Sequence, residues 1–140
     1  MIQVSLESIS NYQSNYFILD DTMDDYPIRI VRKKITNRAL RKFLDNPFSE
    51  MVKCVVDIEQ NIVALGGELH VDAEQLLLEE GSCQADLWGA NIYPDAPPAD
   101  RIDYTALMNI RPSQDNRTME IQDKTVRDRM KAVIKKLIKL

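Results

Sequence analysis

The only histidine of the chain has neighbours of the types that carry acid–base chemistry. Glu68, His70 and Asp72 alternate, so their side chains share one face if residues 68–72 form a strand. A carboxylate beside an imidazole can orient it as a general base or complete a metal site. Glu68 and His70 are therefore the candidate catalytic residues. The alternative is an exposed pair just before a helix that Asp72 caps.

A second set of chemically capable residues follows a predicted strand. Residues 111–117 read Arg-Pro-Ser-Gln-Asp-Asn-Arg, which places two guanidinium groups, a hydroxyl and two amides in one loop. Guanidinium groups match the geometry of phosphates and carboxylates, and a donor-rich loop can cradle an anion. The same arginines could instead pair internally with acidic residues. The candidate ligand-binding residues of the loop are Arg111, Ser113, Asn116 and Arg117.

The single tryptophan belongs to a third set. Trp88 and Tyr93 could form a stacking platform for a base or a sugar, although a tryptophan in a strand is more often part of the core. Gly89 beside it would allow a ligand or another strand to approach closely. Trp88 is therefore a candidate ligand-binding residue.

Several kinds of site are not predicted. The chain has no phosphate-binding loop, no dinucleotide fingerprint and no serine elbow. Its two cysteines are too few for a disulfide framework. A zinc site made by Cys54, Cys83 and His70 would lack the paired spacing of structural zinc sites. We expect no cofactor and no metal.

The net charge of −4 conceals four blocks of opposite sign. Residues 1–26 carry five acidic and no basic residues, and residues 27–53 carry eight basic against two acidic ones. Residues 54–110 hold eleven acidic residues and one basic one, and residues 111–140 hold nine basic against four acidic ones. We expect the basic blocks to lie against the acidic centre and neutralise it. The alternative is that they share one face and bind a phosphate-rich partner.

The length of 140 residues and the apolar fraction of 44% predict one folded domain. No run approaches the roughly 20 apolar residues of a membrane helix, and the N-terminus does not resemble a secretory signal. We therefore expect a cytoplasmic protein that does not enter a membrane. Residues 27–140 are the predicted domain. Residues 1–26 are an N-terminal extension, either a hairpin or an arm that reaches a second subunit of a homo-oligomer.

Hydrophobic periodicity places these residues on predicted elements. The expected strands cover residues 28–31, 51–58, 62–65, 68–71, 87–93 and 102–110. Helices are expected after the caps Thr36, Asp72 and Asp123, and Gly81 should end the second. The predicted fold is α+β: a mostly antiparallel sheet of four to six strands, with about three helices on one face.

Three ordered segments carry a family resemblance. They are Gly66–Asp72, Leu87–Pro94 and Asn109–Gln114. Together they resemble an uncharacterised bacterial family of short proteins that consist of one domain of unknown function, over about residues 28–140. The resemblance implies no activity. It points to the positions already singled out and adds Asn91 to the candidate ligand-binding residues.

These observations favour a small binding or interaction protein whose arginine-containing loop takes an anionic ligand or a phosphate-rich partner. One alternative is a small hydrolase or nuclease in which Glu68 and His70 perform acid–base chemistry while Arg111 and Arg117 bind a phosphate. Another is an RNA-binding protein that uses its basic residues together with Trp88 and Tyr93.

Overall fold

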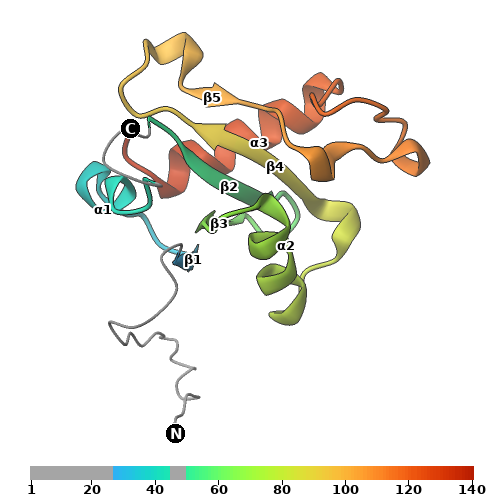
Figure 1. Ribbon diagram of the computed structural model, residues 1–140, viewed down its shortest axis with the longest axis horizontal. Helices are drawn as coiled ribbons and strands as arrows, with labels where there is room; N and C mark the ends of the chain where they lie inside the picture. Colours follow the sequence, from blue (N-terminus) through green and yellow to red (C-terminus); the bar gives the residue numbers. More distant parts are fainter. Residues whose placement is uncertain (1–26, 45–49) are drawn as a thin grey trace, which may run out of the picture.

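The computed structural model describes residues 27–44 and 50–140, which form an antiparallel sheet between helices (Figure 1). The predicted extension, residues 1–26, lies outside the described residues. Short 3-10 helices interrupt the connections after the second α-helix. In chain order the strands and α-helices are β1 (Ile28–Val31), α1 (Asn37–Arg41), β2 (Val52–Asp57), β3 (Ile62–Gly66), α2 (His70–Glu79), β4 (Leu87–Ile92), β5 (Ile102–Asp103) and α3 (Lys124–Leu137).

The five strands are ordered β1-β3-β2-β4-β5, and every neighbouring pair is antiparallel. The predicted α+β class, with its antiparallel sheet and three helices, is confirmed. The central strand β2 pairs with β4 over its full length, from Val52 opposite Ile92 to Asp57 opposite Leu87. This register places the candidate residues Trp88 and Asn91 of β4 opposite Val56 and Lys53 of β2.

One face of the sheet carries the larger core. Alternate residues of the strands, such as Cys54, Val56 and Trp88, pack with the apolar stripe of α3. That stripe recurs at helical spacing and consists of Met130, Val133, Ile134 and Leu137. Leu40 of α1 belongs to the same core.

The opposite face carries a second, smaller core. Val55 and Ala64 point to this side and pack against Ala73 and Leu77 of α2. The helices therefore cover both faces and not one, as Figure 1 shows for α2 and α3. The difference arises because β3 is apolar on both faces, with every residue buried, and Val55 of β2 adds to its second face.

Local capping agrees with the sequence at three places. The side chains of Thr36 and Asp123 accept the backbone N–H groups of Ala39 and Thr125 and so begin α1 and α3. Gly81 adopts a positive φ of 107° just after α2, a conformation that glycine tolerates without a steric penalty. Single residues therefore predicted where α1 and α3 begin and where α2 ends.

Two predicted strands are wrong. Residues 68–71 are not extended, because α2 begins at His70 and the Asp72 carboxylate accepts the N–H of Leu69 from inside the first turn. In the predicted strand 102–110, only Ile102 and Asp103 pair with β4. Among the described helices, none is long and apolar enough to cross a membrane.

Candidate functional site

The loop predicted to bind an anion directs its first arginine inward. Arg111 is only 9% exposed and donates hydrogen bonds to the carbonyl oxygens of Gln84, Leu87 and Met108. Its guanidinium carbon lies 4.4 Å from the centre of the Trp88 ring, which is cation–π geometry. Burial lowers the pKa of Arg111, while the charge of Glu74 opposes that shift. The guanidinium thus binds backbone carbonyls and stacks on an indole ring.

Arg111 and Asn109 together cover the edge of β4 that β5 leaves free. The fully buried amide of Asn109 accepts the N–H of Gly89 and donates to the carbonyl of the same residue, at 2.8 and 3.0 Å. A Cβ added to Gly89 would lie 2.7 Å from the Cβ of Ala106. The predicted close approach at Gly89 is therefore that of the chain's own segment. Two side chains supply hydrogen bonds that a neighbouring strand would otherwise make.

Asn116 closes the same loop. Its amide donates to three carbonyls, those of Asn109, Thr118 and Glu120, and accepts the N–H of Gln122. Asn116 is 3% exposed, so it holds the loop together and has little surface for a ligand. The remaining candidates of the loop, Ser113 and Arg117, are exposed.

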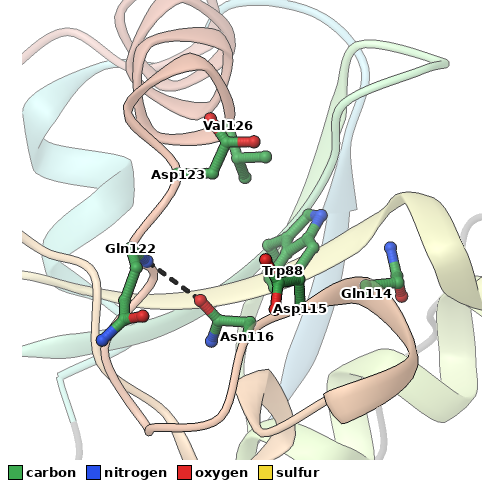
Figure 2. A pocket seen from close by; sticks show the side chains of 7 residues that line it. All are labelled: Trp88, Gln114, Asp115, Asn116, Gln122, Asp123 and Val126. Atoms are coloured by element: carbon green, nitrogen blue, oxygen red, sulfur yellow. Dashed lines mark hydrogen bonds between the residues drawn. The ribbon is translucent and has the colours of Figure 1, made fainter.

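A pocket of about 380 Å³ opens between this loop and the beginning of α3 (Figure 2). It is lined by Trp88, Gln114, Asp115, Asn116, Gln122, Asp123 and Val126, so neither arginine of the loop contributes to it. Trp88 is 4% exposed and belongs to the larger core. Tyr93 lies beyond the end of β4 and does not line the pocket. The two aromatic residues therefore do not form one platform there.

His70 occupies the first position of α2, where its ring nitrogen Nε2 lies 2.9 Å from the carbonyl oxygen of Ala90. Burial is the main influence and lowers the pKa of His70. The hydrogen bond to the Ala90 carbonyl and the neighbouring Asn91 side chain oppose this shift. Glu68 is exposed and makes none of the hydrogen bonds found among the described residues. The candidate catalytic pair thus consists of one anchored imidazole and one solvent-facing carboxylate.

Asn91 lies close to His70 and joins a polar row across the sheet. Its amide nitrogen donates to the carboxylate of Asp103 and to the carbonyl of Thr105, at 3.1 and 3.0 Å. In register, Lys53 and Asp103 flank it on the neighbouring strands. The amide oxygen of Asn91 is the one buried side-chain polar atom without a partner in the part of the chain that the structure describes. Sequence reasoning found His70 and Asn91 but not Asp103, because the pairing of β4 with a two-residue strand was not visible.

The hydrogen bonds of His70 and Arg111 have no partner residue in common. His70 binds the carbonyl of Ala90, whereas Arg111 binds residues at the beginning of β4 and before it. Groups that act on one substrate must converge on it. No hydrogen bond therefore links the acid–base candidate to the phosphate-binding candidate, and the hydrolase or nuclease alternative stays a prediction.

The two basic blocks of the sequence meet at the C-terminal end of α3. Ile35 forms an isolated parallel bridge with Ile138, 103 residues later. The Ile35 N–H donates to the carbonyl of Leu137, and the Lys139 N–H donates to the carbonyl of Ile35. Figure 1 shows α1 beside this end of α3. The pairing brings the segment around Lys33 and Lys34 next to the last residues of the chain.

Most of the cations at this junction form no ion pair with an acidic residue in the described ranges. Four ion pairs are found within the described ranges, and they use Arg32, Arg41, Lys124 and Arg129. All four lie at the surface, where such pairs contribute about 0–1 kcal/mol. Six exposed cations lie within three residues of Ile35 or Ile138 and make no ion pair with any described residue. These six, here called the basic face, are Lys33, Lys34, Arg38, Lys135, Lys136 and Lys139.

Three of the four ion pairs join a basic block to the acidic centre, as expected: Arg32–Glu80, Arg41–Asp95 and Arg129–Glu59. The six residues of the basic face make no such pair with a described residue. The C-terminal dipole of α3 accounts for Lys135 and Lys136, which lie in its last turn. It does not account for Lys33, Lys34 or Lys139. The basic residues gather because two apolar isoleucines pair, which no charge pattern predicts.

Comparison with known proteins identifies the family. No curated protein and no solved structure matches the chain. A family model described as a protein of unknown function, DUF5674, matches residues 29–137. This range agrees with the extent of the predicted resemblance and contains every catalytic and ligand-binding candidate that the sequence analysis named. The chain belongs to the DUF5674 family.

Proposed function

We propose that the protein binds the phosphate backbone of a nucleic acid through the basic face. The observation that carries the proposal is the gathering of six exposed cations, without carboxylate partners among the described residues, around the Ile35–Ile138 bridge. Charges within about 10 Å of one another repel at physiological salt, so their proximity is unfavourable in the free protein. A polyanion relieves that repulsion and releases its own condensed counterions on binding.

The composition of the face favours nucleic acid over a membrane. Five of its six residues are lysines, which contact phosphates as point charges without reading bases. Membrane-surface helices combine such charges with exposed apolar side chains. The large exposed apolar residues of the described ranges lie elsewhere: Leu69, Val71, Leu107, Ile110 and Met119.

The basic face, and not the loop of residues 111–117 that the sequence suggested, is the anion-binding surface in this proposal. In the loop of residues 111–117, Arg111 is bound to carbonyls, and Arg117 is the one arginine left at the surface. A single exposed arginine provides little of the multivalent charge that nucleic-acid binding needs. The basic face provides six charges within two short segments. We also propose that the protein acts in the cytoplasm, where RNA is an available partner; self-association stays a prediction.

The test is a fluorescence-anisotropy titration of labelled single-stranded RNA at about 50 and about 200 mM salt. We expect a dissociation constant of about 1–100 µM at the higher salt, which is close to physiological, and a markedly higher affinity at the lower salt. The double variant Lys135→Glu/Lys139→Glu should weaken binding strongly, because it removes two positive charges and adds two negative ones. All these residues are exposed, so folding should persist.

Arg117→Glu is the matched control, since it reverses an exposed charge in the loop that the sequence favoured. Unchanged RNA affinity in this variant agrees with the proposal. If Arg117→Glu abolishes binding while the double variant does not, the loop is the anion site and the proposal is wrong. A vesicle of anionic lipid is the second control. Tighter binding to vesicles than to RNA would also overturn the choice of partner.

A further inference from the structure

A notch beside the basic face has the composition of a phosphate site. It lies between α3 and the turn that joins β2 to β3, with a volume of about 210 Å³. Its lining consists of Asn61, Arg129, Ala132, Val133 and Lys136. Lys136 is also a member of the basic face, so the notch and the face are continuous. We infer that this notch binds a single phosphate group; the inference rests on the proposed function and specifies one contact within it.

The donors of the notch come from different elements, and one of them is fixed by a hydrogen bond. Asn61 ends the turn in a left-handed conformation with φ 59°. A hydrogen bond of 2.7 Å from Nη2 of Arg129 to the carbonyl of Ile58 fixes the guanidinium against that turn. The other N–H groups of this guanidinium make none of the hydrogen bonds found among the described residues. A fixed guanidinium loses less entropy when it binds a phosphate than a free one.

The shape of the notch depends on a small side chain. Ala132 is exposed and lies on α3 between the turns that carry Arg129 and Lys136, which are seven residues apart. Val133, which also lines the notch, is 4% exposed and belongs to the core. A larger residue at position 132 would fill the space between the two cations. This position therefore allows the notch to be closed without any change of charge.

One carboxylate opposes anion binding. Glu59 Oε1 lies 3.7 Å from Nη2 of Arg129, with both side chains largely exposed. An acidic group at that distance lowers the affinity of the guanidinium for a phosphate by repelling it. Removal of this charge should therefore strengthen phosphate binding, which is an effect opposite in sign to that of the other variants. Lys136 makes no ion pair within the described ranges.

The first arm of the test uses inorganic phosphate with the full-length, isotope-labelled protein at constant ionic strength. We expect phosphate to shift the backbone NMR signals of Asn61, Ala132 and Val133. Ala132→Met should weaken this binding about tenfold, and methionine is a good helix former at an exposed site. Glu59→Gln should strengthen it. Absence of shifts in the wild-type protein, or equal affinities in all variants, would overturn the inference.

The second arm repeats the RNA titration with Ala132→Met. If the notch holds a backbone phosphate, the salt dependence of RNA binding should fall by about one phosphate contact. If RNA binding is unchanged while inorganic phosphate no longer binds, the notch takes a free phosphorylated compound, which supports the phosphate site and assigns its source. If wild-type protein binds phosphate but not RNA, the proposed function fails and the notch stands. If it binds RNA but not phosphate, the inference about the notch fails and the proposed function stands.

Discussion

Replacement of Arg111 by methionine tests whether this residue has a structural role. Methionine keeps the length of the aliphatic stem and removes every hydrogen bond of the guanidinium. The carbonyls of Gln84, Leu87 and Met108 would lose a donor, as would the side chain of Gln114. Because the residue is 9% exposed, water does not readily replace those bonds.

The expected cost follows from these contacts. A buried polar group that loses its partner costs about 1–3 kcal/mol, and the stacking on Trp88 contributes about 1 kcal/mol. The guanidinium no longer has to be desolvated, a burden that its lowered pKa reflects, and this offsets part of the loss. We expect a net destabilisation of about 3 kcal/mol, which is a large fraction of the roughly 5–15 kcal/mol that folded domains have.

Urea unfolding monitored by tryptophan fluorescence measures this change. Trp88 is the only tryptophan and lies in the core beside Arg111, so its emission reports the relevant region. Arg117→Met is the matched control and should change the free energy of unfolding by less than about 0.5 kcal/mol, because Arg117 is exposed. If Arg111→Met were as stable as the control, the structural role of Arg111 would be refuted.

Three further predictions concern other buried groups. Gly89→Ala should destabilise the protein by about 1–3 kcal/mol in thermal unfolding, because the new Cβ would approach that of Ala106 to 2.7 Å; wild-type stability would contradict the packing. A thiol reagent should modify Cys83 rapidly and Cys54 only on unfolding, since burial raises the pKa of Cys54 to about 12; equal rates in the native protein would refute its burial. The pKa of His70 lies below its ordinary 6.5, so the unfolded chain binds more protons and stability should fall as the pH decreases through 6.5. His70→Asn should lose less stability over that range, and identical pH profiles would contradict the shift.

The sequence was most informative where one residue or one period determines the local structure. The alternation in β2 placed Cys54 and Val56 on one face and Val55 on the other, as observed. The caps Thr36 and Asp123 and the stop at Gly81 were also predicted, because each acts within four residues of its own position.

Prediction from the sequence failed where a side chain makes hydrogen bonds that backbone groups of a helix or strand would otherwise make. The alternation of residues 68–72 predicted a strand, but Asp72 caps α2 from its first turn and draws His70 into the helix. The alternating pattern is the same whether the aspartate lies in a strand or caps a helix from its first turn. Similarly, the predicted strand 102–110 is shortened because Asn109 bonds the edge of β4 through its side chain.

The candidate site depended on contacts between distant parts of the chain. Arg111, Asn116 and Trp88 do gather in one region, but the first two hold the loop together from inside. The sequence suggested an internal role for Arg111 only as pairing with acidic residues, whereas Arg111 binds backbone carbonyls, which carry no sequence signature. The basic face arises from the pairing of Ile35 with Ile138, which a charge count cannot reveal.

The salt dependence of RNA binding tests the role of the basic face most directly. Each phosphate neutralised on a single strand contributes about −0.7 to the slope of log affinity against log salt, so six contacts give about −4. Neutralising Lys33, Lys34, Lys135 and Lys139 together, by glutamine, should therefore bring the slope to about −1.4. A slope near −4 that this quadruple variant leaves unchanged, or a wild-type slope near zero, would contradict the assignment of the basic face as the nucleic-acid site.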